Sequence, residues 1–274
     1  MREAVFAGSF YPKDSAKLSF VIDDFLKRVD NKKITDNLLS AVAPHAGYIY
    51  SGQTAAYTYK SISLILKKKN IDTFVIIGPN HTGLGKPISV SMDDWKTPLG
   101  IIKNDIEVSK MLIKNSNYIE ADEIANKEEH SIEVQLPFLQ KITKEPKCVF
   151  ICIGDQSYES AVLLSNAIYD SAKALNREVF LIASSDMNHY ESEDIAKEKD
   201  MHILDKLKKL DIKNFYLAID ETNDSMCGYG AAATAALFAE KKGAKEGVVL
   251  DYTNSGILTN DYNSVVSYAS IIFK

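Results

Sequence analysis

Short apolar runs that alternate with helical patterns constrain the fold of this chain more than any other feature. The runs are rich in Val, Ile and Phe and are apolar at consecutive positions, not only at every second one. Strands that are buried on both faces have this pattern, because helices cover each side of their sheet. Five runs have it clearly, at 38–44, 73–79, 148–154, 178–185 and 264–273, with 247–255 as a sixth candidate strand and 5–11 as a weaker seventh.

Helical patterns fill the intervals between these runs. Their apolar residues recur at spacings of three and four, with Asp14 or Ser15 as the expected N-cap of the first helix and Ser51 as that of the second. Because strand and helix alternate without a linker, we predict one domain over residues 1–274, a three-layer α/β/α sandwich with a largely buried, mixed sheet. The predicted helices cover 16–29, 51–69, 107–115, 131–142, 159–175, 193–210 and 228–243.

The segment 83–104 departs from this alternation. It contains two prolines, three glycines and the only tryptophan. We expect a hairpin or a long loop over the sheet edge, next to His81, where such loops often shape pockets.

Composition limits the class of protein. Of the 274 residues, 46% are hydrophobic and 25% are charged, which is ordinary for a soluble globular domain. The net charge of −5 argues against a nucleic-acid partner, since phosphate binding needs a concentrated basic surface. No stretch approaches the roughly 20 apolar residues of a membrane span, and no secretory signal is visible. We therefore expect a cytoplasmic protein with no membrane partner.

Two of the three cysteines are expected to be inert. Cys148 and Cys152 lie at an even spacing in the run CVFICIG, so both side chains lie on one face of a buried strand. We predict reduced core residues there.

Two histidines follow predicted strands in closely similar settings. His45 lies in SAVAPHAG and His81 in FVIIGPNHTG, each after an apolar run and a proline and shortly before a glycine. Strand ends at one edge of an α/β sheet meet in a single crevice, where ligands bind. The alternative is a pair of loop histidines that bond backbone carbonyls, but the matched setting favours a shared metal ion.

Cys227 is the third candidate ligand. It lies in SMCGYGAAATAA, directly before a predicted helix whose N-terminus would lower the pKa of a thiol and favour thiolate. A thiolate can bind metal or attack carbon. The local sequence fits equally well with a small buried residue under the helix.

Asp186 and His189 follow another predicted strand, in SSDMNHY. Asp186 can orient a metal-binding histidine or act with His189 as an acid/base pair. The serines before Asp186 also suit a turn or a helix N-cap. We predict catalytic roles for both residues.

His130 and Glu133 stand one helical turn apart in EEHSIE and would share a helix face. The pair can complete a metal shell or relay protons, and it can equally be a surface ion pair at a helix start, where Glu128 and Glu129 suit the dipole. We include His130 among the predicted catalytic residues and assign no role to His202. The sequence contains no P-loop, dinucleotide-binding glycine motif, nucleophile elbow or His-Glu-x-x-His motif.

Seven motifs in a fixed order resemble those of the Memo family, whose microbial members are called AmmeMemoRadiSam system protein B. The resemblance runs from about residue 2 to the C-terminus. The family is similar in fold to class III extradiol dioxygenases of the LigB type, non-haem iron enzymes that open catechol rings. The motifs are AGSFYP, APHAGYIYSG, IIGPNHTG, TPLG, EEHSIEVQLPFL, SSDMNHY and CGYGAAA.

The resemblance implies a set of site roles. It places His45, His81 and Cys227 at the metal-binding triad of the family, and Asp186 and His189 at neighbouring site positions. In the dioxygenases two histidines and a glutamate hold iron, and another histidine is the acid/base. His189 resembles that acid/base, with His130 as a helper. Cys227 stands where the dioxygenases have a carboxylate, and a thiolate ligand increases the preference of a site for softer metals. We therefore expect iron or copper.

Three functions are compatible with these residues. The first is a metal-dependent oxidoreductase of unknown substrate, in which His189 moves protons. The second is a non-enzymatic binding protein on a vestigial dioxygenase fold. For it, the resemblance implies a phosphotyrosine peptide or a radical SAM system protein as partner, and Arg2 can pair with an anionic group. The third is a hydrolase with Cys227 as nucleophile, His189 or His45 as base and Asp186 as orienter, although no oxyanion-hole signature is visible.

Overall fold

Four parallel strands form the centre of the sheet in the computed structural model, which describes residues 1–274. In spatial order they are β1 (Ser40–Ala43), β8 (Val179–Ser184), β2 (Thr73–Pro79) and β7 (Lys147–Ile153). β11 (Val265–Phe273) runs antiparallel beside β1, and β3 (Ile88–Ser91) runs antiparallel beside β7, so the predicted mixed sheet is confirmed. The outer and shorter strands are β10 (Gly247–Asn254), β6 (Ile119–Ala121), β5 (Gly100–Asn104), β4 (Trp95–Thr97) and β9 (His189–Glu191).

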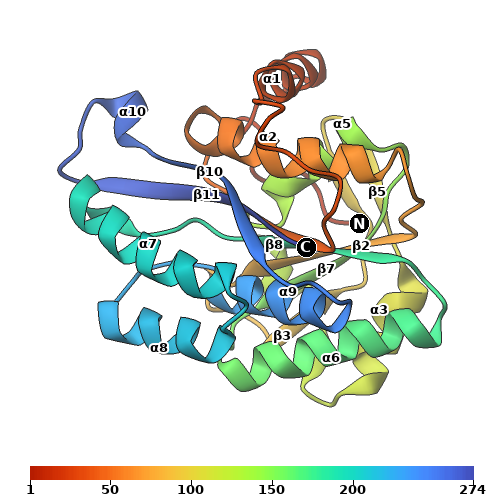
Figure 1. Cartoon of the computed structure of the whole chain (residues 1–274). Coiled ribbons are helices and arrows are strands. Elements are labelled where there is room, and N and C mark those ends of the chain that lie inside the picture. Colours follow the sequence, from red (N-terminus) through yellow and green to blue (C-terminus); the bar gives the residue numbers. More distant parts are fainter.

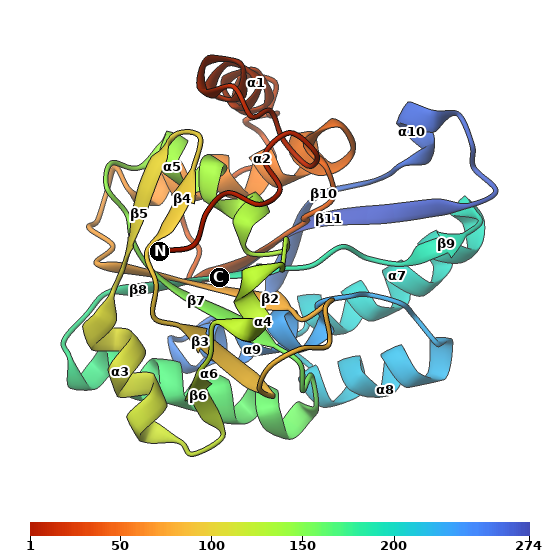
Figure 2. The ribbon, with the colours of Figure 1, turned by 180° about the vertical axis from the view of Figure 1, so that it is seen from behind.

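Helices cover both faces of this sheet (Figures 1 and 2), so the predicted three-layer sandwich is also confirmed. A separate apolar core lies on each face, as the consecutive apolar residues of the strands require. One face carries α1 (Ser15–Lys27), α2 (Tyr48–Ile65) and α5 (Leu136–Ile142), and the other carries α3 (Ile106–Asn115), α6 (Tyr158–Ala174), α7 (Glu193–Lys208), α8 (Ile212–Thr222) and α9 (Tyr229–Lys241). The short elements are α4 (Ile124–Lys127), the 3₁₀ turn η1 (Glu133–Gln135) and α10 (Gly256–Thr259).

Two predictions about the first 51 residues were wrong. Residues 5–11 form turns with one isolated bridge, Ala7 to Tyr11, because the backbone N–H groups of Val5 and Phe6 donate to the Glu133 carboxylate and not to a strand. Ser51 is not a helix cap. Instead α2 begins at Tyr48, and the Ser51 hydroxyl donates to the Ala46 carbonyl within the first turn.

Other local predictions hold. Asp14 caps α1 by accepting from the Lys17 N–H at 2.8 Å. The segment 83–104 contains the expected hairpin, β4–β5, and also supplies β3 to the main sheet, with Trp95 fully buried. No helix combines the length and the apolar character that crossing a bilayer requires.

The parallel strands place the candidate residues at one edge. β1 ends just before His45, β2 just before His81, and β8 just before Asp186. Because β11 is antiparallel to β1, this edge lies where β11 begins and α10 projects, at the left of Figure 1.

Candidate metal centre

The structure brings together the three side chains that the sequence predicts as metal ligands. The ring centroids of His45 and His81 lie 5.2 Å apart, and the Cys227 Sγ lies 3.2 Å from the His45 Nε2. One ligand atom from each of the three residues lies within 4.8 Å of the other two. The distance between Sγ and Nε2 is close to that between two ligand atoms around one tetrahedral metal ion.

A glycine places Cys227 at this point. A Cβ on Gly228 would lie 2.4 Å from the Ser184 carbonyl oxygen, so only glycine allows α9 to begin so close to the end of β8. The Gly228 N–H donates to the Ser185 hydroxyl at 2.8 Å and fixes this contact. The small-residue helix predicted from the sequence therefore seats the thiol directly beside the strand ends.

Hydrogen bonds determine the tautomer of His45. The Ser184 hydroxyl donates its one proton to the Ser131 carbonyl at 2.7 Å and accepts from the Gln135 Nε2 at 2.7 Å. Its remaining contact, 2.8 Å to the His45 Nδ1, must therefore be a bond that the imidazole donates. The His45 Nε2 is left as a bare lone pair beside the thiol.

His81 is oriented in the same way by Glu129. The Glu129 carboxylate accepts from the His81 Nδ1 at 2.9 Å and also from the backbone N–H groups of His81 and Ser131. Burial alone would raise the pKa of Glu129, but these bonds and the neighbouring imidazoles lower it to about 2. A carboxylate that accepts from Nδ1 leaves the His81 Nε2 free to bind metal.

Glu129 and Ser184 are functional candidates that the sequence analysis missed. The sequence predicts an acidic helix start at Glu129, but no helix begins there and its side chain is fully buried. Ser184 was read only as a turn former. The donor set as the structure has it, two bare Nε2 atoms with oriented rings and one thiol, fits a metal ion.

The electrostatic prediction for Cys227 was wrong for the metal-free chain. Burial, and then the nearby Asp186, raise the pKa of the thiol, so the neighbouring helix start does not produce a thiolate. Burial likewise lowers the pKa of His45 well below its usual value, and the imidazole is neutral. A bound cation reverses this balance for a thiol, because metal binding displaces the proton.

His130 stacks on the metal-ligand cluster. The centroid of its ring lies 4.5 Å from that of His81, with an angle of 27° between the ring planes. The Phe10 ring lies on it, at a centroid distance of 4.6 Å. Burial, followed by repulsion from His45, lowers the pKa of His130 to about 3. The predicted pairing of His130 with Glu133 was wrong. The Glu133 carboxylate bonds Arg2 and Tyr11, and the His130 Nδ1 lies 3.3 Å from the Glu129 carboxylate instead.

Glu133 instead binds the N-terminal segment. Its carboxylate accepts from the Arg2 Nη1 at 2.5 Å, from the Tyr11 hydroxyl and from two backbone N–H groups. Arg2 is only 6% exposed, lies over Trp95 and donates to three backbone carbonyls as well. Arg2 is therefore not free to pair with an anionic ligand, contrary to the expectation from the sequence.

Asp186 and His189 both lie next to the cluster. Asp186 accepts from the backbone N–H groups of His45 and Ala46, so it holds the loop of His45 and does not bond an imidazole. The His189 Nδ1 lies 3.0 Å from the Ser225 carbonyl, to which it donates, so its Nε2 carries a lone pair. Both residues line the same cavity as His130.

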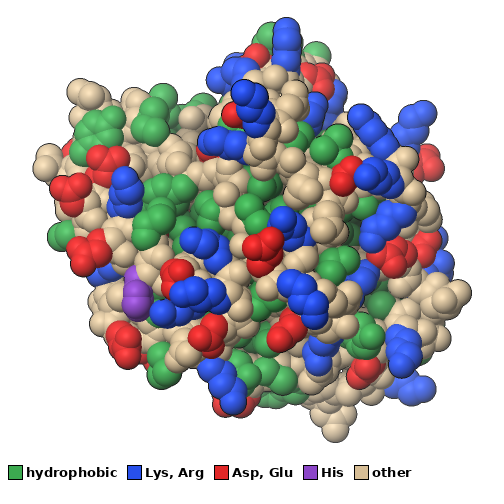
Figure 3. Space-filling view, viewed as in Figure 1, with side chains coloured by type: hydrophobic (Ala, Val, Ile, Leu, Met, Phe, Trp, Pro, Cys, Tyr) green, Lys and Arg blue, Asp and Glu red, His purple; other side chains and the backbone are tan.

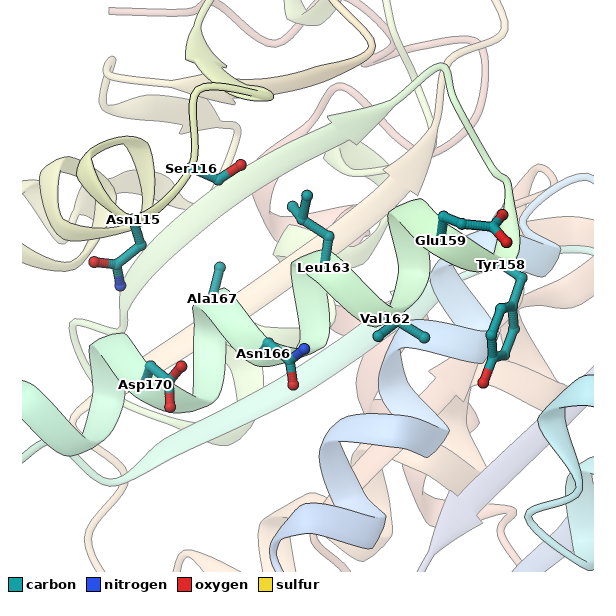
Figure 4. Close-up of a pocket in the computed structure, with 9 residues that line it drawn as sticks. All are labelled: Asn115, Ser116, Tyr158, Glu159, Val162, Leu163, Asn166, Ala167 and Asp170. Carbon is teal, nitrogen blue, oxygen red and sulfur yellow. The ribbon is translucent and has the colours of Figure 1, made fainter.

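This cavity has a volume of about 510 Å³ and opens beside the cluster. Phe10, Tyr50, Tyr190 and Tyr268 supply aromatic walls, and Asp186 and Asp261 are its only acidic side chains. A separate groove of about 630 Å³ lies along α6, with Asn115 and Ser116 of the α3 end opposite (Figure 4). The groove contains no histidine or cysteine, so it offers no comparable chemistry.

Comparisons with known proteins give relatives that match over the full chain and a solved structure of similar fold. A MEMO1 family protein of Methanosarcina barkeri (Mbar_A1422) is 40% identical over 275 residues, covering 100% of both chains. A MEMO1 family protein of Nitrosopumilus maritimus is 38% identical over 279 residues, covering 100% of this chain and 99% of the relative. The solved structure of the uncharacterised protein JW3007 of Escherichia coli K12 has a TM-score of 0.54 at 12% identity, covering 86% of this chain and 100% of that one, and shares the fold alone.

The family model for Memo-like proteins matches residues 2–272. This match and the full-length relatives confirm the resemblance predicted from the seven motifs. This chain belongs to the Memo-like protein family.

Proposed function

We propose that this chain is a metal-dependent oxidoreductase that holds iron or copper with His45, His81 and Cys227. One observation carries the proposal. Both imidazoles donate through Nδ1, to Ser184 and Glu129, which leaves both Nε2 atoms bare. The His45 Nε2 lies 3.2 Å from the thiol, and a ligand atom of His81 lies within 4.8 Å of both. Three protein ligands leave further coordination positions open, which is typical of catalytic sites and not of structural ones. When bound, iron or copper would supply the redox and Lewis-acid chemistry that these side chains lack.

His189 is the proposed acid/base. Its Nδ1 bond to the Ser225 carbonyl fixes the ring and leaves Nε2 able to accept a proton in the cavity. Asp186 supports the site from the other side by holding the backbone of His45. His130 is neutral near neutral pH, because its pKa is about 3, and contributes a ring face to the wall of the cavity.

The cavity favours an uncharged aromatic substrate. Four aromatic side chains line it, together with Val266. No lysine or arginine lines it, and Asp186 and Asp261 would repel an anion. The same features argue against a phosphorylated tyrosine as the ligand of this cavity.

Oxygen consumption tests the activity. Protein loaded with Fe(II) or Cu(I) is mixed with a panel of uncharged phenols, catechols and indoles and with their carboxylated or phosphorylated analogues. We expect O2-dependent turnover with uncharged members and little with anionic ones. His189→Ala should lower turnover by about 10²–10⁴-fold while metal content stays unchanged. His202→Ala changes an exposed histidine on α7 and is the matched control. No turnover by the loaded wild type with any member would refute the oxidoreductase proposal.

A second candidate, a binding protein that docks a radical SAM system partner, is favoured by exposed apolar side chains around the cavity. Tyr190, which lines the cavity, is 78% exposed, and Ile49, which precedes the lining residue Tyr50, is 72% exposed. Ile257 of α10 is 70% exposed and lies in the chain between the lining residues Ser255 and Thr259. Figure 3 shows hydrophobic side chains on the surface at the left, the side from which α10 projects. Ile257→Glu should abolish binding of such a partner in a direct titration, whereas His45→Ala should leave it intact.

A further inference from the structure

Two buried carboxyl groups lie together behind the loops that carry His189 and Cys227. Asp200 on α7 is completely buried, and Asp224, on the loop before α9, is 9% exposed. Lys199, which precedes Asp200, donates to the carbonyl of Asn223, which precedes Asp224, at 3.3 Å, so the two carboxyl groups lie in the same place. Neither residue belongs to the candidate metal centre.

The two carboxyl groups differ in the donors they receive. Asp200 accepts three bonds, from the Asn188 N–H at 3.1 Å, the Tyr252 hydroxyl at 2.7 Å and the Ser267 hydroxyl at 2.5 Å. Asp224 accepts only the Met226 N–H, at 2.8 Å, and its Oδ2 has no hydrogen-bond partner in the chain. The amide of Asn188, also fully buried, lies beside Asp224 but has no well-formed bond through either side-chain atom.

No positive side chain pairs with either carboxyl group. The nearest cation, Lys199 on α7, donates to the Glu191 carboxylate of β9 at 2.8 Å and to the Asn223 carbonyl. β10 contributes the Tyr252 hydroxyl, and β11 contributes only the Ser267 hydroxyl. Two adjacent buried carboxylates without a counter-charge are strongly unfavourable, so the pair needs a proton or a cation.

We propose that Asp200 and Asp224 share one proton, and that this bond positions His189 and Cys227 by joining their loops to α7. Asp200 accepts three hydrogen bonds and Asp224 only one, so we place the proton on the Oδ2 of Asp224, which donates it to Asp200. Asn188 directly precedes His189, and its N–H donates to Asp200. Met226 directly precedes Cys227, and its N–H donates to Asp224. The inference rests on the proposed function for the roles of His189 and Cys227, but not for the shared proton itself.

The sign of the pH dependence follows from burial. Burial raises the pKa of both carboxyl groups, that of Asp200 to about 7. A raised pKa in the folded state gives stability that is fully present below roughly pH 4, the unfolded value, and is lost as the pH rises through about 7. The buried imidazoles His45 and His130 have lowered pKa values and act in the opposite direction below roughly pH 6.5, so the informative window lies above that pH.

Thermal unfolding between pH 6.5 and 8.5 tests the shared proton. The wild type should lose about 2 °C in Tm across this window. Asp224→Asn should lose almost none, because its amide donates to Asp200 at every pH, and it should exceed the wild type at pH 8.5. Asp200→Asn should be less stable throughout, since three donors then lose a charged acceptor. Asp220→Asn, an exposed change on α8, should follow the wild type.

Alkylation of Cys227 in metal-free protein tests the positioning. At pH 8.5 the wild type, with its shared proton lost, should react several-fold faster than Asp224→Asn, and at pH 6.5 the two should react alike. Cys148 and Cys152 are completely buried, and Cys227→Ser gives the background. A residue that supports only the global fold would not produce this pH-dependent difference.

Three results would overturn the inference. Parallel Tm curves for the wild type and Asp224→Asn would exclude a shared proton. A rise in wild-type Tm at pH 8.5 on adding Na⁺, K⁺ or Ca²⁺, absent in Asp224→Asn, would show a cation in place of the proton. Equal alkylation rates at pH 8.5 would refute the positioning role. None of these readouts uses a bound redox metal, so a failure here is distinct from a failure of the proposed function.

Discussion

At the scale of single residues, Glu129 connects more of the candidate metal centre than any predicted residue does. It is fully buried, and it accepts from the ring and backbone of His81 and from the backbone of Ser131. The His130 Nδ1 lies 3.3 Å from the same carboxylate. The carboxylate therefore sets both the tautomer and the direction of the His81 ring.

We expect Glu129→Gln to weaken metal binding by about 10–100-fold, as changes to such orienting carboxylates commonly do. The amide keeps the shape but turns an N–H₂ group toward at least one of the donors that the carboxylate now accepts. Competition against a chelator-buffered series of Cu(I) or Fe(II) concentrations measures the affinity. Glu128→Gln, at the exposed neighbouring position, should bind as the wild type does. Equal affinities of all three proteins would show that Glu129 does not orient His81.

The residues that could be predicted share a local signature. His45 and His81 each follow a proline just after an apolar run, and Cys227 directly precedes a small-residue helix. Ser184 and Glu129 have no such signature, because their roles depend on partners that are 139 and 48 positions away in the chain. The sequence could not predict the raised pKa of Cys227 either, because the burial of the thiol depends on how the loops at this edge of the sheet pack together.

At the scale of elements, the N-terminal segment is a wall of the site and not a strand. Glu133 holds it through Arg2, Tyr11 and two backbone N–H groups. This attachment places the Phe10 ring 4.6 Å from the His130 ring, at the cavity. The alternating residues of VFAGSFY resemble a strand, but two backbone N–H groups of this segment donate to the Glu133 side chain. The local sequence does not indicate this distant partner.

Removing this anchor should be costly. We expect Glu133→Ala to lower the free energy of unfolding by about 3–5 kcal/mol, because it leaves the buried Arg2 guanidinium without its counter-charge. Urea denaturation followed by circular dichroism measures the loss. Glu128→Ala, an exposed change five residues away, should stay within about 0.5 kcal/mol of the wild type. A loss below about 1 kcal/mol for Glu133→Ala would mean that the segment does not depend on this ion pair.

The strands and most helices were predictable, and the exceptions have physical reasons. Runs that are apolar on consecutive positions occur where both faces of a strand are covered, so the six better candidates all became strands of the sheet. α8 was missed because its pattern follows directly on that of α7, and only the left-handed cap at Asn223 marks its end. β3 was missed because it lies within a segment whose prolines and glycines indicate a loop.

At the scale of the whole molecule, the order of the strands creates the site. The three strands that precede His45, His81 and Asp186 are neighbours and parallel, in the order β1, β8, β2, so their loops lie at one edge. α9 packs against β1 and β8 and brings Cys227 to the same edge. The alternation in the sequence predicts the sandwich, but not which strands are neighbours. Lysine and arginine are interspersed with aspartate and glutamate on the face drawn in Figure 3.

The central claim is that this edge binds a redox-active metal, and metal content tests it most directly. Elemental analysis of the full chain, purified without chelator, is run beside His81→Ala, Cys227→Ser and the control His202→Ala, with unfolding curves to establish that all four proteins fold. We predict about one iron or copper ion per chain in the wild type and the control, and almost none in the other two. A wild type that contains neither metal and binds neither on titration would contradict the account.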